Sequence, residues 1–549
     1  MSAAEAETWD AIVVGGGIAG LAAAWELTRA GLRPLLVEAR GYTGGLVAGA
    51  RIAGVRMDLG AEGFVLRGRA VSEAAEALGL EVVGPSGGGA RLLLPPLPDD
   101  DDGGATGPGR PGHRGDRGTA DPDGLWRLHR IPRDCLLGIP ADPTAPDVVE
   151  ILGEAGARRA AADTDLPGRA GTGPDAAADL ASFITARMGP AVLDRLVRPI
   201  VAGIHAADPG ALAADTVAPG LREATARLGS LRAAVGELLR RRRARWGGRS
   251  IDATTRGGLV RLTDALRSAI EADGGSVRTR TGAQSLRPAG SAGDGAARWE
   301  LTLAPTGRGP TPSDEPVAVG PAQRVRTDRL ILACSAGPAR RLLAGAGVET
   351  DLSAPVGSPI ARFMLVVRAP GLAGAPVGSG LLVAPPAPDR RAPVRAKALS
   401  HLSVKWPWIG GELRARHGED VHALRLSYGR PGEPRPEVTL DDALADVEAL
   451  TGVRIAPDGV VDHMLVRWDG TLPPVDAAYR ERAAALVERA ESLPGLGLTG
   501  AWVAGTGIAA VVEHARSRAG RLAGAGSAEG AGGAGDAGDA GTGRGRERA

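Results

Sequence analysis

The fold is decided by Ala11-Ile-Val-Val-Gly15-Gly-Gly-Ile-Ala-Gly20, an apolar run that breaks into a glycine turn. A helical pattern follows from Leu21 to Ala30, with Gly31 just past its end. The next apolar run, Pro34 to Val37, ends in Glu38. A buried strand, a glycine turn, a helix and a second buried strand in this order predict a βαβ unit of the Rossmann type.

The glycines of the turn have the spacing of a dinucleotide-binding site. Gly15 permits the tight turn, Gly17 lets the backbone approach a pyrophosphate, and Gly20 allows the helix to pack closely on the strand. The helix N-terminus presents backbone N–H groups to the phosphates. Glu38 ends the second strand, where it can accept a hydrogen bond from a ribose hydroxyl. The glycine motif alone is weak, and a turn without a ligand is the alternative, but the ordered set favours a bound dinucleotide.

Two further glycine-rich segments favour FAD over NAD. The first contains the pair Gly44-Gly45 and then Met57 to Phe64, which reads MDLGAEGF. The second, Leu498 to Ile508, reads LTGAWVAGTGI and opens a helical pattern. The N-terminus of that helix could lie beside the ligand, where its dipole would stabilise negative charge on a reduced flavin ring. An unrelated turn in a C-terminal domain is the alternative for this second segment.

The composition is that of an ordinary globular protein with more than one domain. A length of 549 residues predicts roughly two to four domains. The formal charge of +1 gives no basic footprint, which argues against nucleic acid as a partner. Basic residues are nearly all Arg, with Lys only at positions 397 and 405, a bias typical of GC-rich codon usage.

Several classes of site and location are disfavoured. The longest apolar runs, such as Gly497 to Val503, are far shorter than the ~20 residues needed to cross a bilayer. The N-terminus is acidic, unlike a signal peptide. Cys135, Cys334 and the eight His residues form no ligand or redox spacing, so no metal site is expected. Together these features predict a cytoplasmic protein.

Three stretches differ in composition from the rest of the chain. Asp99 to Gly124 is rich in Asp, Gly and Pro and is expected to be a flexible insertion. Asp147 to Arg245 is rich in Ala, Leu and Arg, which favours helices. After Gly520 almost all residues are Gly, Ala or charged, which predicts a disordered tail.

These motifs resemble those of a known group of flavoproteins. The paired glycines, the MDLGAEGF segment and the C-terminal GA…GTGI segment are similar to the flavin-binding motifs of the amine oxidase-like superfamily. Within this superfamily, four further segments resemble the protoporphyrinogen/coproporphyrinogen oxidase family. They are Leu125 to Pro143, Leu196 to Pro209, Thr255 to Leu259 and Arg467 to Pro473. The resemblance runs from about Trp9 to about Ala519 and points to the bacterial coproporphyrinogen III oxidase branch.

The resemblance implies an α/β and α+β fold, in which a Rossmann-like FAD-binding domain is built from discontinuous segments. It also implies a substrate domain over the flavin and an inserted helical lobe. The expected bounds are 1–90, 250–340 and 485–520 for the FAD-binding domain, 91–146 and 341–484 for the substrate domain, 147–249 for the lobe and 521–549 for the tail. The implied FAD contacts are Gly15, Gly16, Gly17, Ile18, Ala19, Gly20, Glu38, Gly45, Leu46, Gly60, Ala61, Glu62, Gly63, Ala283, Ala501, Thr506, Gly507 and Ile508.

The chain departs from the family pattern at several positions. His205 stands where the family usually has Tyr, and Ala207 replaces the following Gly. Glu513-His514 replaces a pair of small residues, and Leu46 is neutral where many relatives carry a large or basic side chain. These departures leave FAD binding intact but bear on the identity of the substrate.

The implied activity is FAD-dependent oxidation of coproporphyrinogen III to coproporphyrin III in haem biosynthesis, with oxygen as acceptor and hydrogen peroxide as product. The flavin carries the chemistry, so no catalytic side chain is expected. Arg67 and Arg69 directly follow the flavin-contacting segment and are the candidates for binding substrate carboxylates, because Arg pairs carboxylates in a fork geometry. Two solvated loop arginines are the alternative.

Other activities stay open at this point. They are oxidation of protoporphyrinogen IX, another amine oxidase-like reaction such as that of a desaturase or amine oxidase, and a non-enzymatic FAD-fold binding protein. An amine oxidase usually needs an aromatic pair facing the flavin, and the chain has only three Tyr and three Phe. The expected partners are a porphyrinogen, oxygen and a haem-pathway enzyme that receives the product. Peripheral membrane contact through the helical lobe stays open. The alternative is that Arg240 to Arg245 form a solvated cationic patch.

Overall fold

The computed structural model describes most of the chain. The predicted insertion at 99–124, the side chain of His205, and Arg67 and Thr506 lie outside the described residues. The described residues are 6–66, 68–86, 88–97, 126–173, 176–205, 207–246, 252–289, 298–309, 314–352, 357–386, 392–430, 432–470, 477–505 and 507–529.

The N-terminal βαβ unit forms the middle of a five-stranded parallel sheet. The strand order is β13-β3-β2-β18-β24, and every neighbouring pair is parallel. All residues of β2 and β3 are buried, as expected for strands covered on both faces. The strands are β2 (Ala11–Val14), β3 (Pro34–Val37), β13 (Ser276–Arg278), β18 (Leu330–Leu332) and β24 (Leu496–Leu498). The predicted Rossmann-type fold built from discontinuous segments is therefore confirmed.

The two faces of this sheet pack against different elements. Val13, Leu36 and Ile331 share one core with α1 (Ile18–Arg29), α10 (Val260–Ala272) and α17 (Ile508–Glu529). Their neighbours in the strands point the other way, because side chains alternate along a strand. That second core joins α11 (Ala336–Gly345), α15 (Ala477–Glu491) and a further sheet of β1 (Glu7–Trp9), β14 (Thr281–Pro288), β15 (Trp299–Gly307), β16 (Val317–Ala318) and β17 (Gln323–Thr327).

Two C-terminal helices differ from the sequence-based expectation. Helix α17 continues to Glu529, whereas the disordered tail is expected from residue 521. Leu522 explains the extra length, since it packs into the core of the parallel sheet and its carbonyl accepts a hydrogen bond from Arg329 Nε at 3.1 Å. Helix α15 spans the expected domain boundary at 484/485, because Tyr479 packs in the same core as Leu486. The domain bounds as a set stay a prediction.

A seven-stranded sheet stands beside the parallel sheet. Its order is β23-β19-β22-β21-β20-β8-β9, antiparallel except for the pair β20 and β8. The strands are β8 (Ala90–Leu94), β9 (Arg127–Arg130), β19 (Gly357–Arg368), β20 (Gly380–Val383), β21 (Ala398–His401), β22 (Val421–Tyr428) and β23 (Val460–Gly470). Around it lie α12 (Leu402–Lys405), α13 (Pro407–His417) and α14 (Leu440–Thr451).

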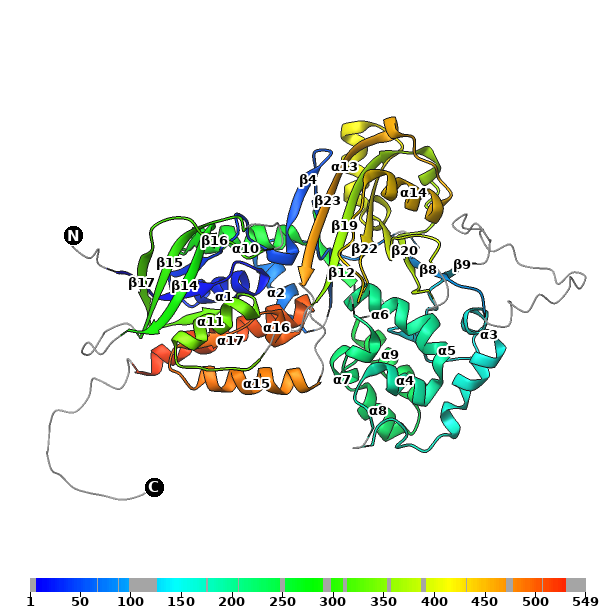
Figure 1. Cartoon of the computed structure of the whole chain (residues 1–549). Helices are drawn as coiled ribbons and strands as arrows, with labels where there is room; N and C mark the ends of the chain where they lie inside the picture. Colours follow the sequence, from blue (N-terminus) through cyan, green and yellow to red (C-terminus); the bar gives the residue numbers. More distant parts are fainter. Residues whose placement is uncertain are drawn as a thin grey trace, which may run out of the picture.

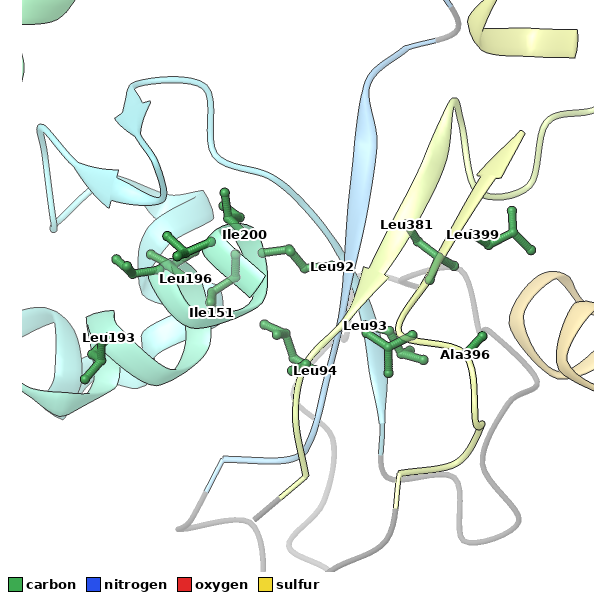
Figure 2. Packing of buried hydrophobic residues seen from close by; sticks show 14 of the residues in the cluster. Leu92, Leu93, Leu94, Ile151, Leu193, Leu196, Ile200, Leu381, Ala396 and Leu399 are labelled. Atoms are coloured by element: carbon green, nitrogen blue, oxygen red, sulfur yellow. The ribbon is translucent and has the colours of Figure 1, made fainter. Parts of the chain in front are cut away.

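Residues 146–246 form a group of helices next to β8 (Figure 1). Figure 2 shows Leu92 and Leu94 of β8 directed toward Ile151 and Ile200 of this group, while Leu93 lies on the other side of the strand. All five side chains belong to one hydrophobic core. The helices are α3 (Pro146–Ala161), α4 (Leu180–Met188), α5 (Pro190–Val192), α6 (Arg198–His205), α7 (Ala214–Val217), α8 (Leu221–Leu228) and α9 (Leu231–Trp246), with a π-helical turn at Leu193–Val197.

Short elements connect these parts. They are the hairpin of β4 (Gly49–Ile52) and β5 (Val55–Asp58), the small sheet of β6 (Phe64–Val65), β12 (Asp252–Thr255) and β7 (Val82–Val83), the pair β10 (Cys135–Leu136) and β11 (Ile139–Pro140), and the helices α2 (Ala70–Ala77) and α16 (Ala501–Ala504). In the part of the chain that the structure describes, no helix combines the length and the apolar character that crossing a membrane requires.

Candidate functional site

The glycine turn between β2 and α1 has three glycines in three different environments. Gly15 has φ +112°, and a Cβ there would lie 2.7 Å from Cys334 N. A Cβ on Gly20 would lie 1.8 Å from the carbonyl oxygen of Gly15. A Cβ on Gly17 would meet no protein atom within 4 Å. Gly15 and Gly20 are therefore required by the protein's own packing, whereas Gly17 faces open space at the N-terminus of α1.

Glu38 is bonded to this turn. Its Oε2 accepts a hydrogen bond from Gly16 N at 2.7 Å, and its Oε1 accepts one from Arg40 N at 2.7 Å. Burial raises the pKa of Glu38, while the two backbone donors oppose that shift. A carboxylate has roughly four lone-pair positions, so Glu38 can also accept a hydrogen bond from a ligand hydroxyl.

The paired glycines and the MDLGAEGF segment lie next to the glycine turn. Gly44 N donates to Gly16 O at 2.8 Å. Ala61 N donates to Leu46 O at 2.9 Å, and a Cβ on Gly60 would lie 2.0 Å from that same oxygen. Three segments that are separate in the sequence thus lie side by side. We call them the glycine row, which comprises residues 15–20, 44–46 and 60–63.

The C-terminal glycine segment reaches the same end of the parallel sheet. β24 lies beside β18, and Trp502 Nε1 donates to Cys334 O at 3.0 Å. Cys334 N is also the atom nearest to the missing Cβ of Gly15. The carboxyl ends of β2, β18 and β24 therefore converge, which is where open α/β sheets bind ligands.

Open space marks both glycine turns of this region. As at Gly17, a Cβ on Gly505 or Gly507 would meet no protein atom within 4 Å. Ile508 begins α17, so a second helix N-terminus opens at this point. Two helix N-termini beside backbone with free space fit a ligand that carries phosphates and an electron-rich ring. The residues present thus fit a flavin dinucleotide.

Ala283 lies on β14, near Glu38. Two residues before it, Thr281 donates its backbone N–H to Glu38 O at 2.9 Å. Ala283 is half-buried, next to the strand end that carries Glu38. The structure therefore brings the predicted contacts at both ends of the sequence to one edge of the sheet, apart from Thr506, which lies outside the described residues.

A cluster of charged side chains, which we call the cationic cluster, lies against the end of the glycine row at Gly60–Gly63. Its members are Arg362, Lys397, Lys405 and Arg425. Glu62 pairs with Lys405 Nζ and with Arg425 Nη2, the latter at 3.1 Å. Arg362 and Arg425 both donate to Gly60 O.

Burial and neighbouring charge shift the pKa values in this cluster. Burial would raise the pKa of Glu62, but Arg425, Lys405 and Arg362 outweigh it and lower the pKa to about 2. Burial, joined by the charge of Arg425, lowers the pKa of Arg362 to about 9. Burial, joined by the charges of Arg362 and Arg430, lowers the pKa of Lys397 to about 8. Glu62 is thus stabilised as a carboxylate, while the cations have too few negative partners.

Most of the cationic cluster has no signal in the sequence motifs. Glu62 and Arg467-Trp468 belong to motif segments, whereas Arg362, Lys405 and Arg425 do not. Arg362 Cζ lies 5.7 Å from the centre of the Trp468 ring, a cation–π distance. One signal was present, because the chain has only two Lys and both belong to this cluster.

The two arginines expected to bind substrate precede helix α2 in the sequence. Arg67 lies outside the described residues, so its position stays a prediction. Arg69 has a side chain that is 78% exposed, and it pairs with Glu73 at 3.1 Å on α2. A Cβ on Gly68 would lie 3.1 Å from Glu513 Oε2, so Glu513 sits beside this loop.

Comparisons with known proteins agree with the fold. Coproporphyrinogen III oxidase of Mycobacterium tuberculosis is 27% identical over 511 residues, covering 91% of this chain and 94% of that protein. The enzyme of the same name from Propionibacterium freudenreichii is 27% identical over 543 residues, covering 92% and 89%. Among solved structures, a candidate protoporphyrinogen oxidase from Exiguobacterium sp. 255-15 aligns with a TM-score of 0.66 at 22% identity, covering 94% of this chain and 99% of that one.

The fold itself hosts more than one activity. Putrescine oxidase aligns with a TM-score of 0.57 at 14% identity, covering 94% of this chain and 99% of that one. At such identities the likeness shows the fold alone. The family is shown by a different finding, since the sequence pattern of the flavin containing amine oxidoreductases matches residues 18–360. The chain belongs to the flavin containing amine oxidoreductase family and is a flavin-dependent oxidoreductase.

Proposed function

We propose that the chain oxidises coproporphyrinogen III to coproporphyrin III, with FAD as cofactor, oxygen as acceptor and hydrogen peroxide as product. The observation that carries this proposal is the extent of the match to enzymes of that name, which covers 91% of this chain and 94% of theirs. A match confined to the dinucleotide motif would cover far less of either chain.

The proposed cofactor would lie along the glycine row. Its pyrophosphate would meet the N-terminus of α1 near Gly17, and its ribose would meet Glu38. Its ring would lie between Gly60–Gly63 and the N-terminus of α17. The open space at Gly17 and Gly507 supports this placement. The remaining proposed contacts are Gly15, Gly16, Ile18, Ala19, Gly20, Gly45, Leu46, Ala283, Ala501, Thr506 and Ile508.

The bound flavin supplies the oxidising chemistry, and the protein positions the substrate and excludes water. Conversion of a porphyrinogen to a porphyrin removes six hydrogens, so three molecules of oxygen become three of hydrogen peroxide. The substrate carries its own pyrrole N–H protons, so the reaction needs no dedicated acid–base pair from the chain.

The test is aerobic oxidation by the purified protein, followed by porphyrin fluorescence and by hydrogen peroxide release. We expect a higher kcat/KM for coproporphyrinogen III than for protoporphyrinogen IX, with three peroxides formed per porphyrin. Because porphyrinogens oxidise slowly in air, the control is the same protein after removal of its flavin. A preference for protoporphyrinogen IX would replace the proposed substrate, and a flavin-bound protein inert toward both would refute the proposal.

A further inference from the structure

The cationic cluster contains more positive charge than the protein neutralises. Arg425 and Lys405 share the carboxylate of Glu62. Arg362 donates instead to the carbonyl of Gly60, and Lys397 Nζ donates to the carbonyl of Gly429. A carbonyl satisfies a hydrogen-bond donor but does not neutralise its charge. Arg362 and Lys397 are therefore the two members of the cluster that donate to a carbonyl and not to the Glu62 carboxylate.

These two residues lie close together on the seven-stranded sheet. Arg362 on β19 is the strand partner of Ser427 on β22, and Lys397 N donates to Ser427 O at 2.8 Å. Burial, and then the charge of Arg362, lower the pKa of Lys397, as expected for a buried amine with a cation nearby. Lys397 is only 7% exposed. Both cations thus adjoin one strand residue, at the side of the sheet that reaches Gly60.

The donors of the cluster are incompletely used. The Nε atoms of Arg362 and Arg425 are buried and, within the described part of the chain, have no hydrogen-bond partner. Arg425 is itself 6% exposed. A buried, unneutralised guanidinium costs several kcal/mol, so a protein keeps one only where something compensates. An anionic group that enters this site would form ion pairs with two cations and accept hydrogen bonds from the free N–H donors.

We propose that Arg362 and Lys397 form the receptor for a carboxylate side chain of the substrate. This inference rests on the proposed function, because a porphyrinogen with four carboxylates is the ligand that would bring such a group to the flavin. Arg69 pairs with Glu73 at the start of α2 and is not part of the cationic cluster, so Arg362 and Lys397 would hold a different carboxylate of the macrocycle. It also accounts for Lys397, one of only two Lys in the chain.

The experiment uses the flavin-loaded protein and compares Arg362→Met, Lys397→Met and the charge-retaining Arg362→Lys. For both Met variants we expect the KM for coproporphyrinogen III and the Kd for coproporphyrin III to rise roughly 10- to 100-fold, with kcat little changed. Arg362→Lys should recover part of the loss. The matched control is Arg368→Met, which lies on the same strand but donates to the exposed carbonyls of His417 and Glu419.

The tetramethyl ester of coproporphyrin III separates charge from shape. The wild type should bind the ester weakly, and the Met variants should bind it as the wild type does. Loss of affinity for acid and ester alike would overturn the inference, as would unchanged affinity for the acid. If the Met variants kept the wild-type Kd for coproporphyrin III but had a lower flavin reduction potential, the two cations would interact with the flavin and not with the substrate. A wild type that neither oxidises nor binds the porphyrin refutes the proposed function itself.

Folding of the variants is checked without substrate. Because Arg362 donates to a carbonyl and not to the Glu62 carboxylate, removing its charge relieves repulsion within the cluster. The Tm of flavin-free Arg362→Met should therefore equal or exceed that of the wild type. A large fall in Tm would mean that Arg362 holds the fold together, and this too would overturn the inference.

Discussion

Gly17 is the residue at which ligand binding can be separated from folding. A Cβ there meets no protein atom within 4 Å, yet it would project into the space proposed for the pyrophosphate. We expect Gly17→Ala to fold normally and to lose most of its flavin, measured as the ratio of visible to ultraviolet absorbance after purification.

The control for Gly17 is Gly411→Ala. Gly411 lies within α13, and a Cβ on it also meets nothing within 4 Å. This variant should keep its flavin and gain up to about 1 kcal/mol of stability, because Ala has the higher helix propensity. Full flavin content in Gly17→Ala would show that the ligand does not approach this turn.

His401 and His422 form a pair whose protonation should weaken the protein in acid. Their rings are in contact, with Nε2 of His401 3.2 Å from Nδ1 of His422, and His401 is fully buried. Burial, and then the neighbouring His422, lower the pKa of His401 from 6.5 to about 4. An unfolded histidine takes up its proton near pH 6.5, whereas the folded one resists until about pH 4, so stability falls as the pH drops through this window.

The measurement is the urea midpoint at pH 7.5 and at pH 5.5. Burial raises the pKa of Asp58 to about 7, so this carboxylate also titrates in the window, but it does so in the wild type and the variant alike. On the order of 1 kcal/mol of the loss between these pH values should come from His401. His401→Leu should remove that part of the pH dependence. An unchanged pH dependence in His401→Leu would contradict the assignment.

Residues of the site divide into those that local pattern predicts and those that it does not. Gly15, Gly17 and Gly20 lie within one turn, so their spacing in the sequence is their spacing in space. Arg362 and Arg425 reach Gly60 from strands that follow it in the chain by 302 and 365 residues. No local pattern records that contact. The Lys bias was the one compositional trace of this cluster, and it names neither arginine.

At the scale of elements, the helical group at 146–246 depends on one buried ion pair. Arg187 of α4 donates to Asp163 Oδ1 at 2.6 Å, and both side chains are fully buried. Asp163 Oδ2 accepts from Ser230 Oγ at 2.7 Å, and Arg187 Nη2 donates to Gly229 O at 2.7 Å. The pair therefore ties α4 to the start of α9.

Arg187→Met should cost on the order of 3–5 kcal/mol, because it leaves the carboxylate of Asp163 buried without its cation. The measurement is urea unfolding followed by far-ultraviolet circular dichroism. The control is Arg158→Met on α3, whose pair with Glu154 is mostly exposed and should matter little. Equal effects of the two substitutions would show that burial of the Arg187 pair does not set its strength.

Elements were predicted well where one pattern covers the whole element, and poorly at their ends. Both β2 and β3 are fully apolar and buried, so sequence and structure agree on them. Helix α17 contains Gly520 and Gly524. Because glycine has a low helix propensity, the local sequence predicts that the helix ends near them. Packing of Leu522 against the parallel sheet outweighs that local preference. Tertiary contacts of this kind have no signature in the helix itself.

At the scale of the whole molecule, the glycine row and the seven-stranded sheet meet at Glu62. Glu62 belongs to the row, while its partners Arg425 and Lys405 belong to β22 and α12. The sequence motifs predicted the glycine row, and the family resemblance implied only a substrate domain over the flavin. Neither could predict this contact between Glu62 and the seven-stranded sheet. Because Glu62 is the carboxylate paired with the cluster, it carries the electrostatic connection between the two parts.

Glu62→Gln should be strongly destabilising, by on the order of 3–5 kcal/mol, because the buried cations lose their negative partner. Adding Arg425→Gln should recover part of that loss, since it removes one of the stranded charges. A double-mutant cycle measured by urea unfolding should therefore give a coupling energy of roughly 1–3 kcal/mol. The control cycle is Glu81 with Arg256, a pair whose side chains are both 59% exposed and which should show no measurable coupling. Independent, additive effects at Glu62 and Arg425 would mean that this ion pair does not couple the two parts of the molecule.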